Sequence, residues 1–135
     1  MAKFIKRRGQ YENSTGSFTF NPETHEARSY GHWQFMKEYK GVILFNAYSY
    51  SNSTSKHQSE ARRLAGYPEM VQVNTRESLD YTETAIKTAI RSLHSDNDQL
   101  ARDIAKPRTR KATNERRASE INHNKMHILK LESLL

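Results

Sequence analysis

The chain contains no cysteine, and it has only 5 glycines and 3 prolines among its 135 residues. The absence of cysteine excludes a disulfide framework and thiolate metal sites, and it suits a reducing compartment. Neither a P-loop nor a GxGxxG motif occurs, which removes the two commonest phosphate-binding glycine motifs. No apolar run approaches the roughly 20 residues that a membrane-spanning helix needs, and the basic start lacks the apolar segment of a secretory signal. We therefore predict a cytoplasmic protein without a membrane partner.

Acidic residues are outnumbered by basic ones. The chain has 22 Lys and Arg against 15 Asp and Glu, which gives a net charge of +7 and a pI near 9.7. The mean hydropathy of −0.95 is low for a compact domain, yet 5 Phe, 7 Tyr and 1 Trp argue against disorder. This balance predicts a small aromatic core with solvated helices, and it favours a polyanionic partner such as RNA or DNA.

Catalytic signatures are also missing. His123 and His127 have the i, i+4 spacing that metals use, but no HExxH surrounds them and such pairs arise by chance on solvated helices. His57 and Ser59 form half of a paired H-x-S/T phosphoesterase arrangement, and the chain has no second half. We predict that the protein is not an enzyme and holds no metal or cofactor.

The pattern of residues predicts an α+β fold in three parts. Residues 1–16 read as a basic N-terminal arm, and 17–74 as a small α+β domain with an antiparallel sheet of three or four strands and one short helix. Residues 75–135 read as a C-terminal hairpin of two long helices. Within the domain, short strands are expected at 17–20 and, as an edge strand, at 70–74.

A β-hairpin with its turn at Lys40-Gly41 is the clearest strand signal. Alternation places Trp33 and Phe35 on one face of the first strand, with His32, Gln34 and Met36 on the other. The return strand carries apolar side chains on both faces. It is therefore expected to be a central strand that is covered on both sides.

The short helix follows this hairpin. Ser55 and Gln58 fit a capping box, and Gly66 followed by Pro68 fits a helix stop, so we expect a helix over 56–65. Asn74 and Glu77 fit a second capping box, which predicts a longer helix that runs to about residue 106 and ends before Pro107.

That longer helix carries apolar residues at heptad spacing, with Glu83 and Asn97 at its polar positions. The predicted oligomer seam consists of Leu79, Ile86, Ile90, Leu93, Asn97, Leu100 and Ile104. The last helix, over about 113–135, has a stripe of Ile121, Ile128, Leu131 and Leu135 with Asn124 in the seam. The hairpin can close within the chain or exchange with a partner chain, and we predict a homo-oligomer. An amphipathic helix lying on its own sheet is the alternative.

The entrance of the short helix gathers hydroxyls and cations, and a helix N-terminus favours anions. The residues predicted to bind phosphate there are Ser53, Thr54, Ser55, Lys56, His57, Arg62 and Arg63. Alternatively, the hydroxyls only cap the helix, and His57 packs as a hydrogen-bonded, half-buried ring.

A basic connector over 106–117 and the aromatic hairpin support nucleic-acid binding. The connector contributes the predicted contacts Arg108, Arg110, Lys111, Arg116 and Arg117, and the hairpin offers Tyr48, Tyr50 and His32 for stacking on unpaired bases. The alternatives are a solvated linker and aromatic residues that belong to the core.

The run from Tyr48 through Ser49, Tyr50 and Ser51 to Thr54-Ser55-Lys56-His57-Gln58 resembles a segment of small uncharacterised tailed-bacteriophage proteins, over residues 30–65. The resemblance implies a phage-encoded accessory protein in the host cytoplasm, and it carries no activity. We therefore expect a non-enzymatic accessory protein that binds nucleic acid through its basic surfaces. The alternative is a protein-interaction module, either an inhibitor of a host protein or a virion or assembly component, that acts through its C-terminal helices.

Overall fold

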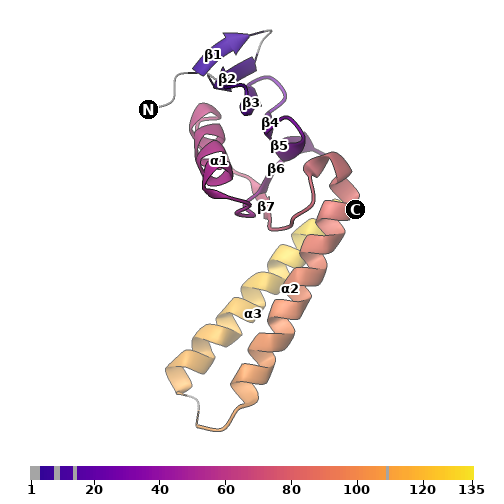
Figure 1. Ribbon diagram of the computed structural model, residues 1–135. Helices are drawn as coiled ribbons and strands as arrows, with labels where there is room; N and C mark the ends of the chain where they lie inside the picture. The colour runs from indigo at the N-terminus through magenta and orange to yellow at the C-terminus, as the bar shows by residue number, and fades with distance from the viewer. Residues whose placement is uncertain (1–3, 8–9, 14, 109) are drawn as a thin grey trace. The chain divides into compact units, whose positions relative to one another are not determined.

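The computed structural model describes residues 4–7, 10–13, 15–108 and 110–135. The chain divides into two compact units, Met1–Ala85 and Ile86–Leu135. The first unit contains a sheet and a covering helix, and the second contains most of a helical hairpin (Figure 1). The predicted α+β class is confirmed, and the division between the units falls inside a helix, later than the predicted boundary after residue 74.

Seven strands form one sheet in the described part of the first unit, and their order in the sheet is their order in the chain. They are β1 (Phe4–Arg7), β2 (Gln10–Asn13), β3 (Phe18–Asn21), β4 (Glu26–Ser29), β5 (Trp33–Tyr39), β6 (Val42–Asn46) and β7 (Val71–Val73). Strands β1 to β6 pair antiparallel as a meander, and β7 pairs parallel with β6.

The prediction of three or four strands was therefore wrong. The predicted arm contributes β1 and β2, and β4 was missed altogether. Each of these three strands has only four residues, and β4 contains a single apolar residue, Ala27. Such short, polar segments give no alternating apolar pattern to detect.

The β5–β6 hairpin is confirmed, with Lys40 and Gly41 between its strands. Both turn residues have positive φ, 48° at Lys40 and 82° at Gly41. A type I′ turn requires positive φ at both central positions, and its twist matches that of the flanking strands. Glycine accepts this conformation without steric cost, whereas Lys40 adopts it against its own preference.

A register shift between β4 and β5 changes which β5 residues face the core. Ala27 pairs with Met36 and Arg28 pairs with Gln34, so Phe35 has no partner in β4. A bulge of this kind bends the strand and lets two successive side chains enter one face. Met36 accordingly joins Phe35 in one core cluster, which corrects the prediction that it lies on the opposite face.

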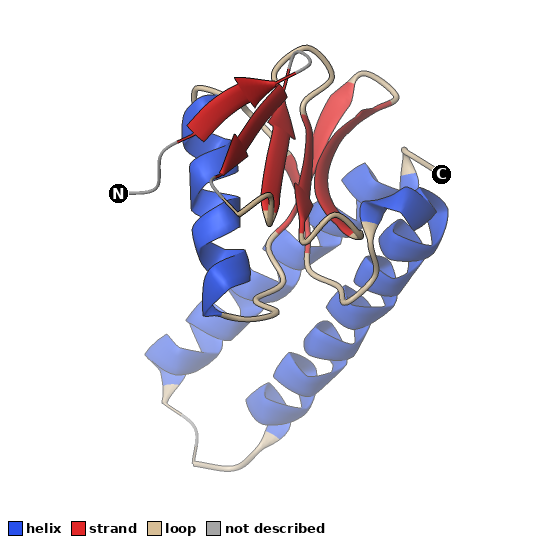
Figure 2. Ribbon diagram, turned by 45° about the horizontal axis from the view of Figure 1, so that its top comes forward, coloured by secondary structure: helices blue, strands red, loops and turns tan. Residues whose placement is uncertain are grey.

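Helix α1 (Asn52–Leu64) covers one face of the sheet (Figure 2). Its Ala61 is completely buried in a core cluster otherwise built from the strands: Phe18, Phe20, Ala27, Trp33, Phe35, Met36 and Phe45. The chain leaves the helix at Gly66, whose φ of 79° provides the left-handed residue that ends many helices. The aromatic core expected from composition is thus formed between α1 and the meander.

A turn of 3-10 helix, η1 (Leu79–Tyr81), precedes the long helix. Its N-cap is Ser78, whose Oγ accepts the amide hydrogen of Asp80 at 3.2 Å. The predicted capping box at Asn74 and Glu77 was therefore wrong. Leu79 is buried in this turn and so lies before the helix that was expected to carry it in a seam.

The second unit is built from α2 (Thr82–Ala105), which starts in the first unit, and α3 (Lys111–Glu132). The two helices run antiparallel, side by side (Figures 1 and 2). Between them, Asn124 Nδ2 donates to Asn97 Oδ1 at 2.9 Å, and Asn97 Nδ2 donates to the Ile121 carbonyl at 3.3 Å. One predicted heptad position of α2, Asn97, thus contacts α3 of the same chain.

Two predicted hairpin positions differ from the structure. Leu135 lies beyond α3 and is 43% exposed, whereas Leu134 is buried. Glu83 is exposed and outside the helix contact. In the described residues, no helix combines the length and apolar character that would cross a membrane.

Candidate functional site

The hydroxyl residues before α1 are used to start the helix. Ser51 is the N-cap, with extended backbone angles, and its Oγ accepts the Thr54 amide hydrogen at 3.2 Å. Helix α1 therefore begins four residues before the predicted start, and Ser53, Thr54 and Ser55 lie inside its first turns. The Ser55 hydroxyl donates to the Ser51 carbonyl at 3.2 Å. The N-cap is therefore Ser51 and not Ser55, so the predicted capping box of Ser55 and Gln58 was wrong.

Gln58, predicted to complete a capping box, has a different function. Its Nε2 donates to the Asn46 carbonyl at 2.8 Å and to the Tyr48 carbonyl at 3.0 Å. Both carbonyls lie where β6 ends and the chain turns toward α1. Because buried carbonyls must be satisfied, Gln58 fixes the helix to the end of the sheet.

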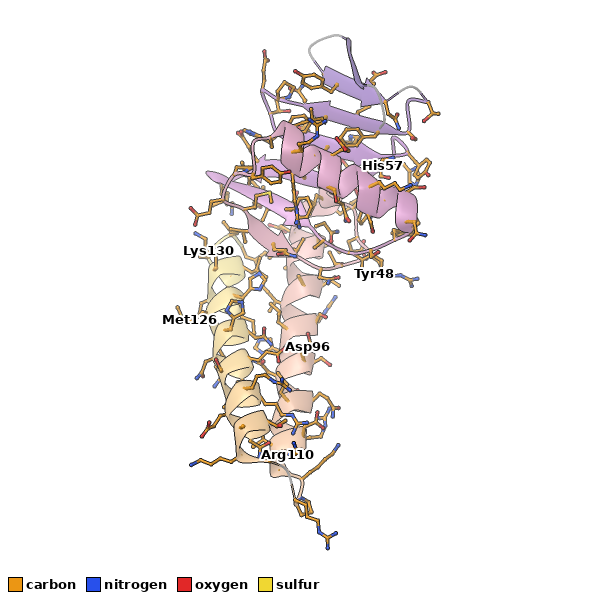
Figure 3. The ribbon with its side chains drawn as sticks, turned by 90° about the vertical axis from the view of Figure 1, so that its left-hand side faces the viewer. Tyr48, His57, Asp96, Arg110, Met126 and Lys130 are labelled. Atoms are coloured by element: carbon orange, nitrogen blue, oxygen red, sulfur yellow. The ribbon has the colours of Figure 1, made fainter. Side chains whose placement is uncertain are left out.

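His57 is 8% exposed and packs in the core (Figure 3). A hydrogen bond of 2.7 Å joins its Nδ1 to the Ser29 hydroxyl, and its ring stacks on Phe18 at 5.4 Å. Desolvation by burial lowers the pKa of His57 below its ordinary value of 6.5. The ring is therefore neutral at physiological pH and offers no cation to an anion.

The two arginines of α1 are also engaged. The guanidinium of Arg62 lies 4.3 Å from the centre of the Phe45 ring. Arg63 donates to Glu60 Oε2 from Nε at 2.9 Å and from Nη2 at 2.7 Å. Lys56 is exposed. The structure thus does not gather Lys56, His57, Arg62 and Arg63 into one cationic surface.

The aromatic residues proposed for stacking lie close to one another. The Tyr48 and Tyr50 rings meet edge to face at 5.8 Å, and Tyr50 meets Trp33 in the same way at 5.5 Å. Tyr48 is partly held, because its hydroxyl accepts a hydrogen bond from Arg76 Nε at 3.1 Å. Tyr50 and His32 line a cavity of about 170 Å³, together with Tyr30 and Trp33.

Sequence reasoning missed Tyr30 and Trp33 as parts of this cavity. Trp33 was assigned to the core by alternation, and it is indeed only 7% exposed. Tyr30 belongs to the turn between β4 and β5, and β4 was not predicted. The Tyr30-Gly31 pair was the available signal, since glycine marks turns.

Positive charge is concentrated where α2 and α3 are joined. Residues 102–117 contain seven cations and two carboxylates, a net +5 of the chain's +7. The cations are Arg102, Lys106, Arg108, Arg110, Lys111, Arg116 and Arg117, and the carboxylates are Asp103 and Glu115. We call this segment the hairpin tip; Figure 3 labels Arg110 within it.

Both carboxylates of the hairpin tip are paired. Lys106 Nζ lies 2.9 Å from Asp103 Oδ1, and Lys111 Nζ lies 4.0 Å from Glu115 Oε1. The hydrogen bond from Lys106 is the main cause that lowers the pKa of Asp103, so this carboxylate stays ionised. Arg117 donates to the Asp103 carbonyl at 3.4 Å.

Arg102 donates to Gln99 Oε1 at 2.9 Å, and three further arginines of the hairpin tip have no side-chain partner within the described residues. Arg108, Arg110 and Arg116 are exposed, and no carboxylate of the described residues forms an ion pair with them. Arg110 is also the N-cap of α3 without a side-chain hydrogen bond, and the first turn of α3 has no acidic residue. The free amides of that turn therefore add to the positive potential of the three guanidinium groups.

The described residues contain no group of three or more His, Asp or Glu side chains that could hold a metal ion. Comparison with known proteins found no matching family model, no matching curated protein and no matching solved structure. The functional proposal therefore rests on the geometry of the chain's own residues.

Proposed function

We propose that the protein binds nucleic acid, without catalysing a reaction, through the hairpin tip. One observation carries this proposal: five of the seven net charges of the chain lie within residues 102–117, and Arg108, Arg110 and Arg116 are exposed without a carboxylate partner among the described residues. Closely spaced cations that are free of internal ion pairs attract a polyanion and release its counterions.

The kind of cation favours phosphate as the ligand. Five of the seven cations are arginines, and the planar guanidinium group matches phosphate oxygens with two parallel hydrogen bonds. The uncapped first turn of α3 offers backbone amides to the same class of anion. Contacts of this type hold the phosphate backbone and read no sequence. The proposed role in an infected host cell rests on the resemblance to phage proteins alone.

A protein partner is the second candidate, because α3 exposes an apolar pair. Met126 is 67% exposed and Leu129 is 60% exposed, and their i, i+3 spacing places them on one helix face. Asn97 of the predicted seam already contacts α3 of the same chain, so this exposed pair is the surface that we expect a host or phage protein, or a second copy of the chain, to use. Light scattering after nuclease treatment separates the two: a complex that survives nuclease supports a protein partner.

A salt series of gel shifts tests the proposed function. The variant Arg108→Gln/Arg110→Gln/Arg116→Gln removes the three unpaired guanidinium groups. We expect its affinity to fall steeply. The slope of log affinity against log salt should decrease by up to about 3 × 0.9 for duplex DNA, if each arginine neutralises one phosphate.

The control removes the same charge elsewhere. Lys56→Gln/Lys87→Gln/Lys125→Gln replaces three exposed lysines outside the hairpin tip. This variant should keep most of the affinity and the salt slope. Equal losses in both variants would show that overall charge, rather than the hairpin tip, drives binding. No shift of any nucleic acid by the unaltered protein would refute the proposed function.

A further inference from the structure

The first unit contains an aromatic cavity, and none of its lining residues belongs to the hairpin tip. It lies at the start of α1, beside the turn between β4 and β5, and has a volume of about 170 Å³. Tyr30, His32, Trp33 and Tyr50 line it, with Ser51 and Thr54 from the beginning of α1. This volume is below the roughly 300–1,000 Å³ of pockets for drug-sized ligands, which suits a small group such as one planar ring.

Two of the aromatic rings that line the cavity are more than half exposed to solvent. Tyr50 is 59% exposed and Tyr30 is 53% exposed. Tyr50 meets Trp33 edge to face at 5.5 Å, which leaves much of its surface uncovered. Exposed aromatic faces that flank a cavity are the surfaces on which unpaired bases stack.

The backbone of Tyr30 is constrained in an unfavourable conformation. Its φ is 55°, in the left-handed region, and Gly31 follows with φ 75°. This region is rare for a bulky side chain. The Tyr30 amide donates to the Ser17 carbonyl at 2.6 Å, which anchors the turn to the start of β3. Strained residues of this kind are concentrated at ligand-binding sites.

His32 adds a polar group to the lining. Its Nδ1 lies 2.9 Å from the Tyr30 carbonyl, which can only accept, so Nδ1 carries the proton. In the neutral ring, Nε2 is then an acceptor. Such an acceptor suits the N–H groups on the edge of a base, which every base carries.

We propose that this cavity takes a single unpaired base of a nucleic-acid strand, stacked against Tyr50 and Tyr30. This inference rests on the proposed function, since it names the form of nucleic acid that the protein prefers. The hairpin tip contacts phosphate on any strand, whereas the cavity requires a base that has left its pair. Single strands should therefore bind more tightly than duplexes of the same charge.

Trp33 provides a direct readout, because it is the one tryptophan of the chain and lines the cavity. Its fluorescence is followed while a single-stranded oligonucleotide is added, with correction for absorbance by the bases. An abasic oligonucleotide of equal length supplies the same phosphates without rings. We expect both to shift the protein on a gel and only the base-containing strand to change the Trp33 emission.

Variants of Tyr50 test whether the change in Trp33 fluorescence comes from a base that is bound in the cavity. Tyr50→Ala should weaken single-strand binding by about tenfold, the usual effect of removing one stacking ring, and leave duplex binding unchanged. Tyr50→Phe keeps the ring and should bind as the unaltered protein does. Tyr81→Ala removes another exposed tyrosine, 67% exposed and outside the cavity, and should have no effect. Circular dichroism confirms that each variant is folded.

The outcomes distinguish the two proposals. If no nucleic acid binds, the proposed function fails and this inference fails with it. If base-containing and abasic strands bind equally and change Trp33 emission equally, only the cavity inference is overturned. If a free nucleoside changes the Trp33 emission and the oligonucleotide does not, the assignment to a strand is overturned and the cavity belongs to a small ligand.

Discussion

His57 links the core of the first unit to pH. Burial lowers its pKa below 6.5, so the unfolded chain takes up a proton more readily than the folded one. The stability contributed by the neutral ring is therefore complete above about pH 6.5, and it is lost as the pH falls through the lowered pKa of the folded state. We expect the midpoint of thermal unfolding to fall over this range.

The variant His57→Gln isolates this effect. Glutamine can hydrogen-bond to Ser29, the partner of His57, but it does not titrate. Differential scanning calorimetry between about pH 8 and pH 5 should show a smaller loss of stability for the variant than for the unaltered protein. Parallel curves would show that other groups cause the pH dependence.

At this scale, the sequence allowed two interpretations of His57 and could not separate them. Imidazole serves equally as an anion contact and as a hydrogen-bonded core ring, and the choice depends on whether Ser29 and Phe18 face it. Phe18 lies in β3, and Ser29 lies in β4, which was not predicted. By contrast, the Glu60–Arg63 ion pair has i, i+3 spacing on α1, a local signal that the prediction of Arg63 as an anion contact did not use.

Among the elements, β4 and η1 are joined by one ion pair. Arg28 Nη1 and Nη2 donate to Asp80 Oδ2 and Oδ1 at 2.7 and 2.6 Å. This hydrogen bonding is the main cause that raises the pKa of Arg28 and lowers the pKa of Asp80. The pair fixes the turn before α2 to the sheet, although both side chains are about one-third exposed.

A double-mutant cycle measures the strength of this pair. We expect Arg28→Ala and Asp80→Asn to be coupled by about 0.5–1 kcal/mol in urea unfolding, the upper range for a partly exposed pair. Because the folded pKa of Asp80 is lowered, the coupling should be present above the ordinary carboxyl pKa of 3.8 and be lost as the pH falls through the lowered value. Coupling near zero at neutral pH would show that solvent screens the contact.

Elements with strong local signals were predictable, and those without them were not. The alternation around Lys40-Gly41 gave the β5–β6 hairpin, and heptad spacing gave α2. The start of α1 was misplaced because the segment 49–55 contains several hydroxyl residues with suitable spacing. In the structure Gln58 does not take part in a capping box, because its Nε2 donates to the Asn46 carbonyl.

Across the whole molecule, the free energy of local opening should differ from one element to the next. Strand β5 is hydrogen-bonded on both sides and has four buried residues in succession, whereas β7 has three residues and pairs with β6 alone. Opening free energies range from nearly zero at frayed segments to the global value in core strands. We expect β5 amides to exchange with deuterium at least about tenfold more slowly than those of β7 or of residues 106, 108 and 110.

Native-state hydrogen exchange followed by mass spectrometry gives this comparison on the intact chain. The amides within α2 near Asn97 serve as an internal reference, because helix hydrogen bonds protect them without a sheet. Exchange of β5 as fast as that of the hairpin tip would mean that the meander opens as readily as a loop, contrary to its burial.

For the hairpin tip, the sequence indicated where the cations lie along the chain but not which of them have partners. The basic run at 106–117 was visible in the sequence. Only the structure shows which cations of this run have partners: Lys106 and Lys111 form ion pairs, whereas Arg108, Arg110 and Arg116 form none with the described residues. The cavity near Tyr50 is lined in part by the turn between β4 and β5. The alternation of residues within one strand does not predict such a turn.

The pairing of each meander strand with its immediate neighbour in the chain has a kinetic consequence. Most of the sheet has low contact order, so each hairpin closes only a short loop and can form soon after its residues leave the ribosome. Strand β7 is different, because its parallel ladder with β6 brackets the whole of α1. The ladder between β6 and β7 therefore closes a longer loop than any hairpin of the meander, and we expect it to be the last part of the sheet to form.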